Sequence, residues 1–272
     1  MNPYSDLPKA AFWRSGVQDS APTNMAGLYQ RKWPIRANEN VATAGSCFAQ
    51  HIARFMKKNG FSVLDMEPPP RGLPEKFAKN YGYCLYSARY GNIYTVRQLL
   101  QLIHEAEGRF VPVDPVWERG GRYFDSQRPN VEPQGLDSPD EVLAHRRVHL
   151  EALRALLRRQ DIFVFTLGLT EAWIDAPTGT VYPTAPGVIA GSFDPTRHQF
   201  KNFGFNEIYA DLVAVRRALR RYRPQLRILL TVSPVPLTAT ASGRHVLQAS
   251  TYSKAVLRAV AGQFSAEHDD VD

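Results

Sequence analysis

Residues 161–169, DIFVFTLGL, form a nearly continuous apolar run with polar residues on both sides. Such a run predicts a central strand of a parallel sheet, because a strand covered on both faces points apolar side chains both ways. The preceding Ser138-Pro139-Asp140-Glu141 has a hydroxyl N-cap, a proline at the first helical position and a glutamate three residues after the cap. We therefore expect a helix over 138–159 that leads directly into a buried strand.

Strand and helix patterns alternate on both sides of this pair. Further strands are expected at 40–44, 61–66 and 226–235, and further helices within 46–60 and over 95–108, 206–222 and 249–265. In the first of these helices we expect one apolar stripe made of Phe48, Ile52, Phe55 and Met56. Strands separated by helices predict an α/β fold of three α/β/α layers around a parallel sheet of four or five strands.

We expect a single domain of residues 39–272 that includes two long loop regions, preceded by a separate N-terminal segment. Residues 1–38 show little periodicity and are expected to form an N-terminal arm. Two regions rich in glycine, proline and aromatic residues, 109–137 and 175–204, are long for plain connections. We expect them to form a lid or the wall of a site.

Composition excludes several classes of protein. With 272 residues, 44% hydrophobic and 22% charged, the chain is neither disordered nor fibrous. Its two cysteines are too few for a disulfide scaffold or a four-thiolate zinc site. Neither an export signal nor an apolar run of about 20 residues is visible. We expect a cytoplasmic protein without a membrane partner.

A net charge of +7 does not identify a partner by itself. Arginine is concentrated in 145–159 and 215–227, both on amphipathic helical patterns. A basic helix can bind nucleic acid, but a solvated helix face is the commoner meaning of such a run. The glycine-rich nucleotide-binding motifs and His-Glu-x-x-His are also absent, so neither a cofactor nor a metal is expected.

The turns after three predicted strands are the places where chemistry is expected, because parallel sheets bind ligands at the carboxyl ends of their strands. These turns are Gly45-Ser46, residues 166–171 and residues 233–236. Gly45-Ser46 also opens a helix, so the Ser46 hydroxyl lies near free backbone N–H groups. Ser46 is then either a nucleophile with an oxyanion donor beside it or a simple N-cap. Cys47 is the rival nucleophile, with His51 one turn further on.

Five ordered blocks of the sequence resemble those of one known family. They are Gly45-Ser46-Cys47-Phe48-Ala49, RYGNIYT (89–95), TLGLTEAW (166–173), TVSPVP (231–236) and Tyr252-Ser253-Lys254. The string GSCFA is similar to the signature of the GSCFA family, and the blocks extend over most of the chain.

This family is similar in fold to the SGNH (GDSL-type) hydrolases, which are esterases and acyl-transfer enzymes with a flavodoxin-like sheet. The resemblance implies that Ser46 is the nucleophile and that Gly91 and Asn92 complete the oxyanion hole. It also implies that Gly45, Thr170, Glu171 and Trp173 contact the substrate, with Thr170 where relatives have an amide side chain.

The sequence departs from the SGNH pattern at the general base. SGNH enzymes use an Asp-x-x-His pair near the C-terminus, and no aspartate here has a histidine three positions later. Asp194 and His198 are four apart, and His268 precedes Asp269. The chain is therefore expected to be a shortened form that lacks a C-terminal strand and helix. Alternatively, His245 is the base.

These observations leave two main hypotheses. In the first, the chain is an SGNH-like hydrolase or acyltransferase for an acylated carbohydrate, with Tyr90, Tyr94, Trp173 and Tyr182 as stacking faces or plain core residues. In the second, it is a catalytically silent binding or assembly protein, and nucleic-acid binding is a distant third. A shortened chain also predicts an exposed apolar patch near Phe264 and a homo-oligomer.

Overall fold

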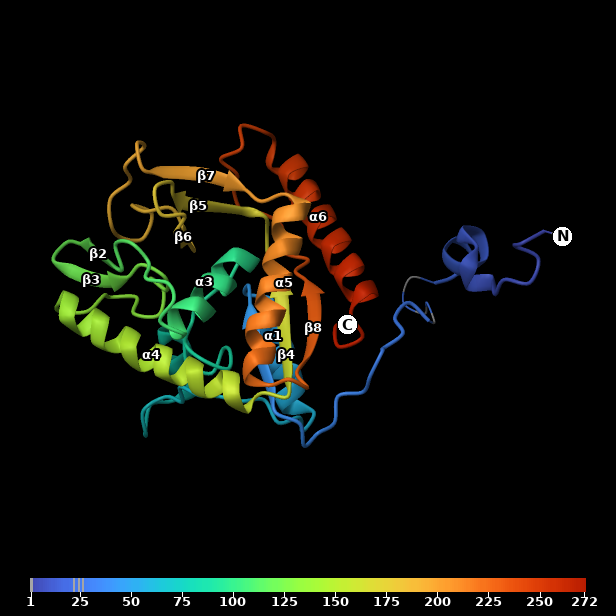
Figure 1. The fold of residues 1–272 in the computed structure, drawn as a ribbon, viewed down its shortest axis with the longest axis horizontal. Helices are drawn as coiled ribbons and strands as arrows, with labels where there is room; N and C mark the ends of the chain where they lie inside the picture. Colours follow the sequence, from blue (N-terminus) through green and yellow to red (C-terminus); the bar gives the residue numbers. More distant parts are fainter. Residues whose placement is uncertain (1, 22, 24, 26) are drawn as a thin grey trace. The chain divides into compact units, whose positions relative to one another are not determined.

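A parallel sheet with the strand order β1–β4–β8 organises residues 35–272 (Figure 1). Its strands are β1 (Val41–Gly45), β4 (Ile162–Leu167) and β8 (Arg227–Val232). Every residue of β1 and β4 is buried, as the continuous apolar run predicts for central strands. Thr166 lies opposite Gly45 on one side and Thr231 on the other, so the carboxyl ends of all three strands lie at one edge.

Both edges of this sheet carry a single further parallel bridge, Val63 beside Val41 and Val271 beside Ile228. The strand predicted at 61–66 is therefore wrong in extent. The chain turns away early because the Met66 N–H bonds the Ser87 carbonyl at 2.9 Å, and three prolines without N–H groups follow at 68–70.

The helices begin and end close to the predicted positions. They are α1 (Ala49–Lys58), α3 (Val96–Ala106), α4 (Pro139–Arg159), α5 (Phe205–Tyr222) and α6 (Val246–Glu267), with a short α2 (Glu75–Ala78) and a 3₁₀ turn, η3 (Lys79–Tyr81). Thr95 caps α3 by accepting from the Gln98 N–H, and Ser138 caps α4 by accepting from the Glu141 N–H, both at 3.2 Å. α1 packs on β1 and α6 on β8, while α3 packs against α4 and α5 (Figure 1).

The predicted apolar stripe of α1 is confirmed at Met56, which is buried, and is wrong at Phe55. Phe55 is 67% exposed, and the buried side chains are Ala49, Ala53 and Met56. Small alanine side chains let the helix approach β1 closely, which leaves the larger Phe55 on the outer face.

The exposed apolar patch predicted near Phe264 of α6 is not found at that residue. Phe264 is fully buried, and its ring centroid lies 4.5 Å from that of His268.

The two long loop regions, with the residues just before the second one, contain antiparallel structure that the sequence does not predict. β2 (Val116–Arg119) and β3 (Arg122–Asp125) form a hairpin, and β5 (Glu171–Asp175), β6 (Val181–Tyr182) and β7 (His198–Asn202) form a sheet in the order β6–β5–β7. β5 begins four residues after β4 ends, so this second sheet stands directly at the carboxyl edge of the parallel sheet.

The computed structural model describes residues 2–21, 23, 25 and 27–272. The chain divides into two units, Met1–Pro34 and Ile35–Asp272. The first unit contains a 3₁₀ turn, η1 (Lys9–Ala11), and a π turn, η2 (Arg14–Gln18). In the described part of the chain, no helix has the length and apolar character needed to cross a membrane.

Candidate active site

A cavity of about 530 Å³ opens at the carboxyl ends of the three parallel strands. Its wall includes the residue that follows each strand, namely Ser46 after β1, Gly168 after β4 and Ser233 after β8. The sequence predicts these three turns as the ligand-binding edge, and the cavity confirms that they meet. Residues 128–130 and 182–185 from the two long loop regions complete part of the wall.

The Ser46 hydroxyl has no hydrogen-bond partner in the described chain, and Ser46 lines this cavity. Gly45 has φ +140°, and a Cβ there would lie 2.5 Å from the Thr166 carbonyl oxygen, so only glycine fits this turn. Ser46 is 3% exposed, and its Oγ makes no hydrogen bond within the described residues. The N-cap of α1 is Phe48, so the Ser46 side chain is not a helix cap. A buried hydroxyl without a partner on a cavity wall calls for an explanation, and a role toward a ligand is one.

Gly91 and Asn92 line the same cavity from the loop before α3. Gly91 has φ +66°. Two residues later, the Ile93 N–H donates to the Gly45 carbonyl at 2.9 Å. The Asn92 side chain accepts from the Tyr86 hydroxyl at 2.6 Å and donates to the Tyr94 hydroxyl at 3.1 Å. An amide nitrogen has two N–H donors, so one donor of Asn92 is left for a ligand. The structure thus brings Ser46, Gly91 and Asn92 together as the resemblance predicts.

A comparison with known families decides where the chain belongs. The family model that matches it covers residues 40–272, which include all five sequence blocks and every strand of the parallel sheet. The chain belongs to the GSCFA family. Among curated proteins no significant match is found. The solved structures likewise give none.

The TLGLTEAW block of this GSCFA domain divides between the cavity and the core. Glu171 and Trp173 of β5 line the cavity, and the buried Glu171 carboxylate accepts from the Thr240 hydroxyl at 2.8 Å. Thr170 is not brought to the cavity. It is fully buried, its N–H donates to Ser253 Oγ at 3.0 Å, and its hydroxyl has no partner in the described chain.

Lys254 is a functional candidate to which the sequence analysis assigned no role. Its Nζ donates to the Gly168 carbonyl at 2.5 Å. A Cβ on Gly168 would lie 3.1 Å from the Ser46 Cβ, so Gly168 touches both residues. Burial lowers the pKa of the Lys254 amine, while nearby Cys47 acts in the opposite direction. The signal in the sequence was its place as the last residue of the Tyr252-Ser253-Lys254 block, but nothing local shows that this residue reaches β4.

Cys47 also lies on the cavity wall, and its side chain is free and exposed. His51 is exposed on the next turn and does not line the cavity. The rival nucleophile is therefore accessible, but the histidine proposed beside it is not part of the cavity wall.

The histidines considered as a base lie elsewhere. His245 is the exposed N-cap of α6, and its Nδ1 accepts from the Leu247 N–H at 3.2 Å. His198 accepts from the Asp194 N–H at 2.9 Å, and His268 lies against the Phe264 carbonyl. Within the described residues, no histidine lines the cavity.

Three of the four aromatic side chains named from the sequence line the cavity, namely Tyr94, Trp173 and Tyr182. Burial raises the pKa of Tyr94, and it raises that of Tyr182 to about 12, so both phenols are neutral at neutral pH. Tyr90 belongs to the core, because its hydroxyl donates to the Thr43 carbonyl at 2.5 Å and the residue is 3% exposed. In the part of the chain that is described, no cluster of three or more His, Cys, Asp or Glu residues suits a metal ion.

Proposed function

We propose that this GSCFA domain is an SGNH-like acyl-ester hydrolase or acyltransferase that uses Ser46 as its nucleophile. One observation carries the proposal: the buried Ser46 Oγ has no partner among the described residues and shares a cavity with Gly91 and the Asn92 amide. A hydroxyl that attacks an acyl carbon needs donors for the oxyanion that forms, and Gly91 and Asn92 line the same cavity as Ser46.

The sheet supports the fold part of this proposal. Across the sheet the order is Val63, β1, β4, β8 and Val271, when the two edge bridges are included. If the five segments are numbered as they occur along the chain, β1 is 1, Val63 is 2, β4 is 3, β8 is 4 and Val271 is 5. The order across the sheet is then 2-1-3-4-5, which is the order of a flavodoxin-like sheet. We propose on this basis a three-layer SGNH-like architecture, in which the switch of strand order beside β1 places Ser46 at the ligand crevice.

The proposed reaction has two steps. Ser46 Oγ forms a bond to the acyl carbon, its proton passes to a base, and the carbonyl oxygen becomes an oxyanion that Gly91 N–H and Asn92 Nδ2 stabilise. When the oxyanion collapses, the ester C–O bond breaks and the leaving alkoxide takes the proton from the base. Water or an acceptor alcohol then removes the acyl group from Ser46 by the same steps in reverse order.

Two groups are candidates for the base. His245 is the candidate from the sequence, and it would have to release the Leu247 N–H before it acted. Lys254 is the candidate from the structure, because it binds Gly168, which touches Ser46, and because burial favours its neutral amine. Lys254→Arg keeps a donor for the Gly168 carbonyl but cannot accept a proton at neutral pH. If Lys254 is the base, this variant loses activity while His245→Ala keeps it.

An acylated carbohydrate remains the proposed substrate class. The cavity combines the faces of Trp173 and Phe200 with one buried carboxylate, Glu171. Aromatic faces stack on sugar rings, and a carboxylate accepts hydrogen bonds from sugar hydroxyls.

The deciding experiment compares the wild type with Ser46→Ala and Cys47→Ala. We expect acetyl-ester turnover and stoichiometric labelling by a fluorophosphonate in the wild type and in Cys47→Ala, and neither in Ser46→Ala. Equal turnover in wild type and Ser46→Ala would refute the proposal. Loss in Cys47→Ala alone would move the nucleophile to the thiol.

A silent binding or assembly protein is the second candidate, and the absence of histidine from the described cavity wall favours it. It predicts a ligand whose binding survives Ser46→Ala and a wild type that the fluorophosphonate does not label. Nucleic-acid binding has less support, because Arg216 and Arg220 pair with Asp270 and Arg146 pairs with Asp125.

We also propose a reducing, cytoplasmic location, since Cys47 and Cys84 are both free. A homo-oligomer stays a prediction for light scattering, now without the support of an exposed Phe264.

A further inference from the structure

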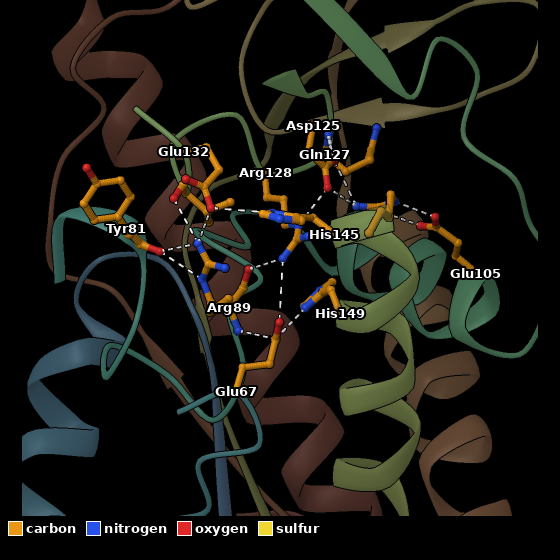
Figure 2. Close-up of polar contacts among 12 residues, drawn as sticks. Glu67, Tyr81, Arg89, Glu105, Asp125, Gln127, Arg128, Glu132, His145 and His149 are labelled. Carbon is orange, nitrogen blue, oxygen red and sulfur yellow. Dashed lines mark hydrogen bonds and ion pairs between the residues drawn. The ribbon is translucent and has the colours of Figure 1, made fainter. Parts of the chain in front are cut away.

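A buried ion cluster lies behind the cavity wall that carries Gly91. It consists of Glu67, Arg89, Glu105, Asp125, Arg128 and Arg146, and none of these side chains is more than 9% exposed. They come from the segment after Val63, the loop before α3, α3 itself, β3, the loop after it and α4 (Figure 2). Arg128 and Arg146 pair with the three carboxylates, and the Arg89 guanidinium pairs with Glu132 at the rim.

Two carboxylates of the cluster, those of Glu67 and Asp125, are ionised at neutral pH. The pKa values of Glu67 and Asp125 are lowered to about 2, because partners that favour the charged form outweigh the cost of burial. For Glu67 these partners are His149 and Arg128, and for Asp125 they are Arg146 and Arg128. Each carboxylate is therefore a fixed, strong hydrogen-bond acceptor.

Two members of the cluster hold the backbone of Arg89 from opposite sides. The Arg89 N–H donates to Glu67 Oε2 at 2.7 Å, and the Arg89 carbonyl accepts from Arg128 Nη1 at 3.2 Å. Arg128 is fixed in turn by Asp125, which accepts from its Nε at 2.7 Å, and Glu67 also binds His149 Nδ1 at 2.7 Å (Figure 2). Both polar backbone groups of Arg89 thus end on buried charges.

The residues after Arg89 are fixed to β1 in the same way. The Tyr90 hydroxyl donates to the Thr43 carbonyl, and the Ile93 N–H donates to the Gly45 carbonyl. Gly91 lies between these attachments, and a Cβ at Gly91 would lie 3.7 Å from the Arg128 Cβ. The position of Gly91 relative to Ser46 is therefore set by β1 on one side and by the ion cluster on the other.

Fold stability is a weak explanation for such a cluster. Desolvation of buried charges offsets most of their attraction, and an apolar core of similar volume is often as stable. Hydrogen bonds to buried charges are short and directional, so they can fix the position of a backbone group. Oxyanion donors need this, because their catalytic effect depends on being placed before the charge develops.

We propose that Glu67 and Arg128 are positioning residues for the oxyanion hole, which fix the Arg89 peptide and thereby hold the Gly91 N–H toward Ser46. The inference rests on the proposed acyl-transfer function. Neither residue touches the reacting atoms in this role, although Arg128 also forms part of the cavity wall.

The chain offers a matched pair of variants for the test. Glu67 and Glu105 belong to the same cluster and are both 9% exposed. The Glu105 carboxylate accepts a hydrogen bond from the Arg146 Nε at 2.6 Å. Within the described residues, it makes no hydrogen bond to the Arg89 backbone. Glu67→Gln and Glu105→Gln each remove one buried charge, and only the first alters the attachment of the Arg89 N–H.

We expect Glu67→Gln to lower kcat for an acetyl ester about tenfold or more with KM unchanged, and to slow fluorophosphonate labelling of Ser46 by a similar factor. Glu105→Gln should stay within about threefold of the wild type at a comparable melting temperature. Hydrogen exchange in a peptide covering residues 88–94 should be faster in Glu67→Gln than in Glu105→Gln. This third readout reports the position of the loop without catalysis.

The outcomes separate this inference from the proposed function. A labelled wild type with equal losses in both variants, or with no loss in either, would overturn the inference and leave the proposed function standing. An unlabelled and inactive wild type would overturn the proposed function and, with it, the catalytic role of the cluster. If Glu67→Gln does not fold, Arg128→Lys tests the other attachment, because the lysine side chain is too short to reach the Arg89 carbonyl while the charge is kept.

Discussion

We expect the free energy of unfolding of this protein to fall as the pH is lowered from 7.5 to 5.0, because of His149. Its ring lies on α4, is fully buried, and binds Glu67 Oε2 through Nδ1 at 2.7 Å. Its Nε2 has no partner within the described residues. Burial, helped by the positive charge of Arg128, lowers the pKa of His149 from 6.5 to about 4, against the opposing effect of Glu67.

The sign follows from which state binds the proton. Between pH 6.5 and about pH 4 the unfolded chain protonates His149 and the folded chain does not, so acid favours unfolding. The stabilising effect is complete above pH 6.5 and is lost as the pH falls toward 4. Linkage gives a loss of about 2 kcal/mol between pH 7.5 and pH 5.0. Glu67 and Asp125 act in the same direction only at lower pH, because their unfolded pKa values are 4.5 and 3.8.

The variant for this test is His149→Gln, which keeps an N–H donor for Glu67 but does not titrate. Urea unfolding at pH 7.5, 6.5, 5.5 and 5.0 measures the free energy of unfolding of each protein. The wild type should lose about 2 kcal/mol more than His149→Gln across this range. His145→Gln, on the same helix but with a side chain 46% exposed, controls for the loss of a histidine from α4. Parallel curves for wild type and His149→Gln would refute the reasoning.

Two further substitutions test the packing. Gly168→Ala would place a Cβ 3.1 Å from the Ser46 Cβ and 2.9 Å from the Tyr94 carbonyl oxygen, so fluorophosphonate labelling of Ser46 should slow about tenfold or more. Gly262→Ala, whose Cβ meets only the end of the Arg258 side chain, should label like the wild type, and equal rates for both variants would contradict the predicted displacement of Ser46. Phe264→Ala should cost about 3–5 kcal/mol in urea unfolding because Phe264 is fully buried, and a cost under 1 kcal/mol would show that the site collapses or is not core.

The sequence by itself determined the features that local chemistry specifies. The apolar run of 161–169 has no stable environment except a strand buried on both faces, and β4 is that strand. Ser138 caps its helix as predicted, because an N-cap bond joins residues three positions apart. Gly45-Ser46 was found because its glycine is demanded by the turn itself.

Only the tertiary structure decided which of the remaining residues reach the cavity. Thr170 and Glu171 are neighbours in the sequence, yet Thr170 lies in the core and Glu171 on the cavity wall, because β5 turns into a second, antiparallel sheet. Strands β5 and β7 of that sheet are short and only partly buried. Their pairing joins residues up to 31 positions apart, because Glu171 lies opposite Asn202. Local patterns do not contain such partners.

The ion cluster shows the same limit most clearly. Glu67 and His149 are 82 residues apart, and Arg89 and Arg128 are 39 apart. Each of these charged residues alone is typical of a solvated surface, and its burial is favourable only after the fold has brought an opposite charge or a backbone group to it. The sequence therefore identified the serine that is proposed to react, whereas the contacts that hold the loop opposite it come from long-range packing.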